Sequence, residues 1–331
     1  MNIKRDLSNL PTADPRLEER VVGHPPTRNP TIGPALANAW FKARTHDDNL
    51  ARSIPDAGPF RGSDAGKCNR QLWYRLQGTE MTEPPNLADH WRMDLGSMVH
   101  EQLQGAIKSI TPNAINELAL DLRPAGIPGS MHLDILNPVE YGDGLYFEAV
   151  EIKTVNGFGF KSMATDFKRS GPEGPRESHI MQACIGAAAA HLGGEYKGCI
   201  TGARVVYLSM ELVSPQLAAN IGLGGDESRF CAEWFYPIDF CLEVAAREAQ
   251  RMTSVHHMHL TDEPWVEGFI PMSAYEVDNI QIVNPKTGAG VDTRGKGAKT
   301  WMCGYCSYQS QCIDDYDNVR AGAIQEMERN E

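Results

Sequence analysis

The sequence has no apolar run that approaches the ~20 residues a membrane-spanning helix needs. Its opening, Met1-Asn-Ile-Lys-Arg-Asp6, leads into no hydrophobic segment of the kind found in secretory signals. An internal repeat is also missing. We therefore expect a soluble, cytoplasmic protein without a membrane partner.

An excess of positive charge is missing as well. The 331 residues include 31 Lys and Arg against 43 Asp and Glu, which gives a net charge of −12. This balance excludes a protein that coats nucleic acid by bulk charge, although a locally basic groove would be enough to bind a phosphate backbone. Hydrophobic residues make up 41% of the chain, enough for a sizeable core.

The chain has eight cysteines, and in an intracellular chain of this size we do not expect a disulfide framework. We expect four of the eight to be small buried hydrophobic residues, because they lie in apolar or alanine-rich surroundings: Cys184, Cys199, Cys231 and Cys241.

The periodicity of apolar residues predicts a mixed α/β chain. Residues 1–62 begin with a polar, proline-rich stretch, so we expect an N-terminal arm that is partly flexible. A helix is expected to start at Ser63 or Asp64. Further helices are predicted at residues 86–110, 157–169, 176–192 and 239–256. Strands are predicted at residues 114–122, 129–136, 147–154, 204–210 and 230–236.

Three charged residues lie on the two predicted strands at the centre of the chain. Glu151 and Lys153 are two apart on one strand and therefore share a face. Asp134 meets them if the strands pair, on a strand where Met131, Leu133 and Ile135 are expected to share the opposite face. Two carboxylates and an ammonium can hold Mg²⁺ or Mn²⁺ beside a phosphodiester. The alternative is a solvent-facing strand with a surface ion pair.

His100 and Gln182 are the next candidates, and both lie on predicted helices. His100 lies beside an apolar stripe, where it is either a structural residue or a metal ligand. Gln182 shares a helix face with His179 and Gly186. Its amide can bond a water or a nucleic-acid backbone, or it can be an ordinary surface amide.

The strongest local motif is Cys303-Gly-Tyr-Cys306-Ser-Tyr-Gln-Ser-Gln-Cys312. Three thiols in this spacing indicate a metal site or a redox pair, and the strand–helix context of a thioredoxin-type pair is absent. Zinc or an iron–sulfur cluster would need a fourth ligand. Cys68 is the first candidate, and a fallback that would favour zinc comes from His256, His257 or His259. The glycine-rich, basic stretch 284–300 reads as a loop that could contact nucleic acid.

The order of these motifs resembles that of the RecB-type nucleases of the PD-(D/E)XK superfamily. It is most similar to their iron–sulfur branch, the CRISPR-associated exonucleases and the AddB-type nuclease domains, from about residue 63 to residue 312. The resemblance implies a restriction-endonuclease-like α/β core, with a mixed central β-sheet flanked by helices, plus a cysteine-ligated cluster lobe. The implied domains are the arm 1–62, the nuclease core 63–282 with a helix at Cys68 that joins the cluster lobe, and the cluster-binding segment 283–331.

The resemblance also implies roles for individual residues. A 4Fe–4S cluster would be held by four cysteines: Cys68, Cys303, Cys306 and Cys312. Mg²⁺ or Mn²⁺ would be held by His100, Asp134, Glu151 and the backbone carbonyl of Ile152. Lys153 would act on the attacking water, and Gln182 matches the glutamine of the family's last motif. That motif continues to a tyrosine four residues later, where this chain has Gly186, so we do not expect the tyrosine–DNA contact of the family at this position.

From this resemblance we expect a metal-dependent DNA exonuclease that hydrolyses single-stranded DNA or DNA ends. The chain has no Walker A loop, so a helicase would be a separate partner, as would recombination or CRISPR proteins or further copies of the chain. Bases are expected to stack on Trp73, Tyr74 and Tyr305. One alternative is a DNA-binding accessory protein that keeps the fold and cluster without cutting, and another replaces the cluster with structural zinc.

Overall fold

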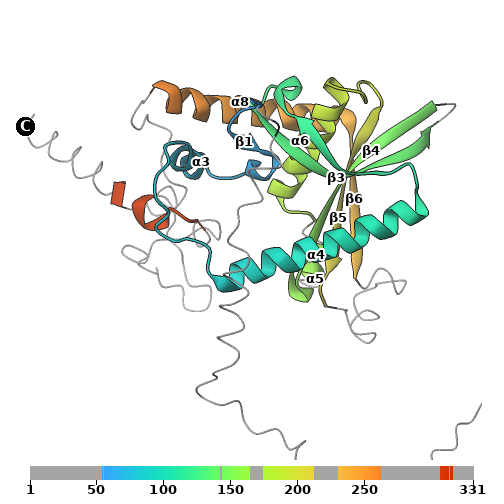
Figure 1. The fold of residues 1–331 in the computed structure, drawn as a ribbon, viewed down its shortest axis with the longest axis horizontal. Helices are drawn as coiled ribbons and strands as arrows, with labels where there is room; N and C mark the ends of the chain where they lie inside the picture. Colours follow the sequence, from blue (N-terminus) through green and yellow to red (C-terminus); the bar gives the residue numbers. More distant parts are fainter. Residues whose placement is uncertain are drawn as a thin grey trace, which may run out of the picture. The chain divides into compact units, whose positions relative to one another are not determined.

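A six-stranded mixed β-sheet forms the centre of the computed structural model (Figure 1), which describes residues 54, 56–141, 144–164, 174–211, 230–261, 306–312 and 314–315. The strand order is β1-β3-β4-β5-β6, and β2 also pairs with β3. β1 runs parallel to β3 and β4 parallel to β5, whereas the other pairs are antiparallel. The strands are β1 (Phe60–Arg61), β2 (Ile115–Asp121), β3 (Gly129–Tyr141), β4 (Gly144–Val155), β5 (Ile200–Ser209) and β6 (Cys231–Pro237).

Helices flank this sheet, which confirms the predicted mixed sheet between helices. The α-helices are α3 (Asn69–Leu76), α4 (Leu87–Ile110), α5 (Gly157–Ala164), α6 (Glu177–Leu192) and α8 (Ile238–Thr261), and short 3-10 turns occur at Gly62–Asp64 and Arg123–Ala125. The sequence placed the end of α8 at His256, but the helix continues, so the histidine cluster lies within it. Within the described ranges, no helix is both long and apolar enough to cross a membrane.

The two faces of the sheet carry separate apolar clusters. Ala149 of β4 and Val205 of β5 belong to the larger cluster, together with the buried residues of α6 and α8. Val150 and Ile152 belong to a smaller cluster on which Leu103 and Ile107 of α4 pack. Alternate residues of β4 therefore enter opposite clusters, as the period of two in a strand requires.

β3 loses its regular alternation at Asp134. Leu133 belongs to the larger cluster and Ile135 to the smaller one, so the prediction that these two residues share a face was wrong. The pairing of β2 with β3 skips Glu117, whose φ of 51° lies in the left-handed region. The pairing of β3 with β4 also stops here, at Ile135 opposite Val150. The side chains of β3 therefore switch between the two faces of the sheet at Asp134, the candidate metal ligand on this strand.

α6 is buried along half its length because small residues let it approach both the sheet and α8. Its continuous buried run is Ala183, Cys184, Ile185, Gly186, Ala187, Ala188, Ala189 and Ala190. Cys184 meets Cys241 of α8, and both thiols are fully buried and free. The expectation of burial is confirmed for these two. It was wrong for Cys199 and Cys231, which are only partly buried because they lie just before β5 and at the first position of β6.

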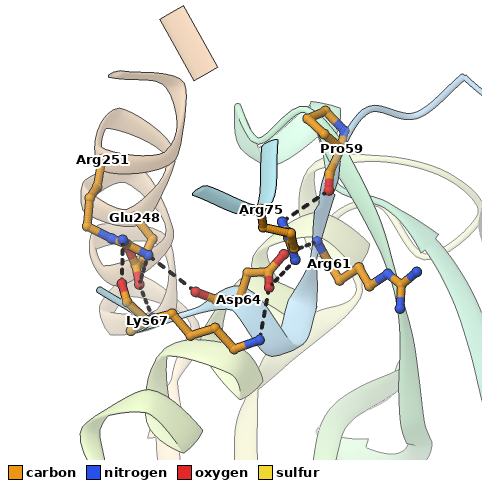
Figure 2. A network of polar contacts seen from close by, with 8 residues as sticks. Pro59, Arg61, Asp64, Lys67, Arg75, Glu248 and Arg251 are labelled. Carbon is orange, nitrogen blue, oxygen red and sulfur yellow. Dashed lines mark hydrogen bonds and ion pairs between the residues drawn. The ribbon is translucent and has the colours of Figure 1, made fainter. Parts of the chain in front are cut away.

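A buried carboxylate, that of Asp64, holds the segment before α3 in place through several hydrogen bonds (Figure 2). Asp64 is fully buried, and its carboxylate accepts hydrogen bonds from Arg75 Nη1 at 2.6 Å, Lys67 Nζ at 3.1 Å and the backbone N–H of Arg61 at 2.8 Å. The predicted helix start at Ser63 or Asp64 was therefore wrong. Gly66, at φ 68°, turns the chain out of the 3-10 turn, and α3 begins at Asn69 with Cys68 as its N-cap.

A second buried carboxylate continues this network into α8. Glu248 is 2% exposed and accepts a hydrogen bond from the Gly66 N–H at 2.6 Å. Arg251 pairs with Glu248 and donates to the backbone carbonyl of Lys67 at 2.8 Å and to Asn69 Oδ1 at 2.6 Å. The loop that leads to Cys68 is thus held between α3 and α8 by charge-assisted hydrogen bonds.

The described part of the C-terminal segment packs beside α3. The backbone N–H of Glu83 donates to the Ser307 carbonyl at 3.0 Å. The ring of Tyr308 lies 5.5 Å from that of Tyr74, and Asp315 bonds both the Tyr74 hydroxyl and Arg70. Residues more than 220 positions apart in the chain therefore lie side by side (Figure 1).

Candidate active site

Glu151, Lys153 and Gln182 meet where β4 passes under α6. Lys153 Nζ donates to Glu151 Oε1 at 2.6 Å and to Gln182 Oε1 at 3.1 Å. Glu151 and Lys153 share a face of β4, as the sequence predicted, and Gln182 reaches them from the second turn of α6. The amide of Gln182 therefore contacts the lysine and is not an ordinary surface group.

Glu151 is 1% exposed, so a solvent-facing surface pair does not describe this strand. Burial raises the pKa of Glu151 to about 7, against the opposing attraction of Lys153. Its second carboxylate oxygen, Oε2, is buried and has no hydrogen-bond partner in the described part of the chain. A buried carboxylate oxygen without a donor is the kind of atom that a cation can satisfy.

Asp134 lies in the opening between β3 and β4. Its Oδ2 accepts the backbone N–H of Ile152 at 2.7 Å, beyond the last paired residues of the two strands. Its Oδ1 lies 3.4 Å from Nδ1 of His100 on α4. The hydrogen bond to Asp134 raises the pKa of His100, despite the opposing effect of burial. The structure thus brings His100, Asp134 and Ile152 together, next to Glu151.

A pocket of about 350 Å³ opens at this end of β4. It is lined by His100, Ile152, Lys153, Thr154, Val155, Asn156, Gly159, Arg176 and His179. Sequence reasoning gave Arg176 and His179 no functional role. A signal existed for His179, which precedes Gln182 by three residues and so shares its helix face.

His179 is oriented by Tyr207, the residue directly opposite Lys153 in the pairing of β4 with β5. Nδ1 of His179 lies in a short contact with the Tyr207 hydroxyl, which also accepts the backbone N–H of Arg176 at 3.1 Å. Burial, together with the positive charges of Lys153 and Arg176, lowers the pKa of His179 to about 3. His179 is therefore a neutral imidazole at physiological pH.

Gly186 stands where the resemblance predicts a tyrosine, and the packing accounts for it. A Cβ added to Gly186 would lie 3.2 Å from Leu133 Cδ1 and 3.2 Å from Met131 Cε. No aromatic ring fits between α6 and β3 in this packing. The tyrosine hydroxyl near the site comes instead from Tyr207 of β5.

The donor set at this site fits a hard divalent cation by its chemistry. Carboxylate oxygens, an imidazole and a backbone carbonyl are available from His100, Asp134, Glu151 and Ile152, and the lone Oε2 of Glu151 is among them. As the side chains stand, no group of three or more His, Cys, Asp or Glu residues in the described ranges is arranged to hold a metal ion. The same applies to His256, His257 and His259. The ligand roles therefore stay predictions.

The predicted cluster ligands lie only partly within the described ranges. Cys68, Cys306 and Cys312 are partly buried, whereas Cys303 lies outside the described residues. Tyr305 and the basic stretch 284–300 lie outside them as well, as does most of the N-terminal arm. Tyr74 is 2% exposed and bonded to Asp315, so the prediction that it stacks on bases was wrong.

Comparisons with known proteins place this chain in no family. No protein-family model matches the sequence, and no curated protein matches it. Among solved structures, the crystal structure of SSO0001 aligns with a TM-score of 0.36 and 15% sequence identity, over 86% of this chain and 96% of that chain.

Proposed function

We propose that the protein is a divalent-metal-dependent deoxyribonuclease of the RecB type, with a restriction-endonuclease-like core, which shortens single-stranded DNA or DNA ends. The observation that carries the proposal is the hydrogen-bonded Glu151–Lys153–Gln182 group, with its buried carboxylate, beside Asp134 and His100. Lys153 and His100 also line the pocket. Burying charged groups often costs stability, and buried groups with shifted pKa values cluster at functional sites.

The site residues divide into metal ligands and groups that act on the water and the phosphate in phosphodiester hydrolysis. His100, Asp134, Glu151 and the carbonyl of Ile152 would hold Mg²⁺ or Mn²⁺, which supplies Lewis-acid polarisation of the phosphate. Lys153 orients the attacking water and offsets negative charge on the phosphate. Gln182 Oε1 accepts a second hydrogen bond from the Lys153 ammonium, at 3.1 Å, which helps to keep the ammonium beside Glu151.

The nuclease activity is tested with end-labelled single- and double-stranded DNA and anaerobically purified protein. We expect shortening of the labelled strand with Mn²⁺ or Mg²⁺ and none in EDTA, and the position of the label gives the polarity of cleavage. Folded protein that binds DNA equally well in EDTA but never cuts would be the non-cleaving accessory protein. The packing at Gly186 is the observation that favours this second candidate, because it removes the family's tyrosine.

We further propose a 4Fe–4S cluster held by Cys68, Cys303, Cys306 and Cys312. The packing of residues 306–315 against the helix that Cys68 caps supports this proposal, because it brings the upstream and downstream segments together. Such a cluster would be structural and would tie the two ends of the core to each other.

Metal analysis distinguishes this cluster from zinc. Anaerobically purified wild-type protein should be brown and contain about four iron atoms per chain. Cys68→Ser should lose most of the iron, whereas Cys199→Ser, which changes a cysteine outside the ligand set, should retain it. Zinc alone in the wild-type protein would overturn the cluster and leave a structural zinc site.

A further inference from the structure

Among the described residues, those that line the pocket at the end of β4 include cations and hydrogen-bond donors but no carboxylate. Lys153 and Arg176 contribute positive charge, and His100 and His179 contribute imidazoles. Its volume of about 350 Å³ lies at the small end of the ~300–1,000 Å³ found for ligand pockets. Such a lining suits a small anion with attached polar groups. The pocket itself is too small for a duplex.

The hydrogen bonds of Tyr207 determine which nitrogen of His179 carries the proton. The backbone N–H of Arg176 donates to the Tyr207 oxygen, so the hydroxyl proton of this fully buried tyrosine is directed to its other neighbour, His179 Nδ1. Nδ1 then accepts, and the proton of the neutral ring lies on Nε2. His179 is thereby held as a neutral donor in the wall of the pocket.

Arg176 lines the same pocket. It is exposed, and it is the N-cap of α6, a helix of 16 residues. The partial positive charge at this helix end adds to the guanidinium and to the nearby Lys153. A guanidinium has the bidentate donor geometry that a phosphate prefers.

We propose that Arg176 and His179, with Tyr207 as a positioning residue, form a subsite for a DNA phosphate next to the bond that is cut. The subsite rests on the proposed nuclease function for its place in the reaction. Its ligand is a phosphate group of the bound strand, either a terminal monoester or an internal diester. Seated there, the strand would be held in register while the neighbouring phosphodiester lies at Lys153.

Binding in EDTA tests the subsite without requiring cleavage. Three fluorescent oligothymidylates are compared by anisotropy, one with a 5′-phosphate, one with a 3′-phosphate and one with neither. We expect Arg176→Ala and His179→Gln to weaken binding about tenfold. Arg247→Ala, which removes an exposed arginine of α8 outside the pocket, should bind as the wild type does. Inorganic phosphate should compete with the oligonucleotide in the wild type and less in the two pocket variants.

The positioning role of Tyr207 is tested by asking whether the effects of Tyr207→Phe and His179→Gln on binding are additive. Tyr207→Phe should weaken binding about threefold in the wild type and clearly less in His179→Gln, because the hydroxyl acts on the ligand through the imidazole as well as through its bond to the Arg176 N–H. In the cleavage assay these variants should raise KM with kcat within about threefold. A loss of folding would instead lower the thermal midpoint and the active fraction together.

The three oligonucleotides separate the sources of the phosphate. A tenfold loss confined to one terminally phosphorylated strand identifies the end group, and an equal loss with all three identifies an internal phosphate. If Arg176→Ala and His179→Gln bind all three as Arg247→Ala does, the subsite is overturned. Wild-type protein that binds as proposed but never cuts would overturn the nuclease and leave the subsite standing.

Discussion

Replacing Lys153 with alanine is expected to lower metal-dependent DNA cleavage by about 10³-fold. The ammonium donates to Glu151 and Gln182 and lies at the pocket wall, where it can offset negative charge on a bound phosphate. Loss of one such electrostatic contact in a desolvated site typically costs ~10²–10³ in rate, and the loss of an oriented water adds to it. Single-turnover cleavage of end-labelled DNA at saturating protein measures the effect.

Two further variants test whether the loss of activity is specific to the ammonium at position 153. Lys153→Arg should not restore activity, because the planar guanidinium cannot replace the ammonium between two oxygens at 2.6 and 3.1 Å. Lys108→Ala, an exposed position in the last turn of α4, should cut at the wild-type rate. Cleavage by Lys153→Ala within threefold of wild type would remove this residue from the reaction.

Replacing Asp64 with alanine is expected to lower the free energy of unfolding by about 3–5 kcal/mol, the range for breaking a buried ion pair. Burial raises the pKa of the Asp64 carboxyl, but Lys67 and Arg75 outweigh it and leave the pKa below its usual value. Without the carboxylate, the Arg75 and Lys67 cations and the Arg61 N–H lose their acceptor together. Urea denaturation at pH 7 measures the change.

The matched control for Asp64→Ala is an exposed pair of the same kind. Arg92 and Asp89 of α4 pair at 2.8 Å, but the Arg92 side chain is 70% exposed. Asp89→Ala removes this pair and a helix-start carboxylate, and should cost about 1 kcal/mol. If Asp64→Ala were as mild as Asp89→Ala, the network around the Cys68 loop would be dispensable for folding.

Periodicity predicted most of the elements and one half of the site. A strand's period of two is enough to place Glu151 and Lys153 together, and a helix's period places Gln182 on the face that His179 shares. The contact between Gln182 and Lys153 is different, because it depends on how α6 crosses β4. Neither periodicity predicts how two elements cross. From the sequence, Gln182 could therefore be either a functional amide or an ordinary surface amide.

The break in β3 at Asp134 was beyond prediction for a related reason. Nothing in the residues around Asp134 signals that Glu117, on the neighbouring strand, takes a left-handed φ or that the ladder to β4 ends there. Likewise, Tyr207 belongs to no motif, and its position opposite Lys153 follows only from the register of β4 with β5. The buried pair of Asp64 and Glu248 could not be inferred either, because single carboxylates read as surface residues.

The two walls of the site differ in how firmly they are anchored. α6 carries Gln182 and His179 directly before its run of buried residues, whereas α4, which carries His100, has no buried residue at all and is attached through Leu103 and Ile107. Displacing α4 costs little apolar contact compared with displacing α6. His100 therefore belongs to an element that can shift at lower cost than the element that holds Gln182 and His179.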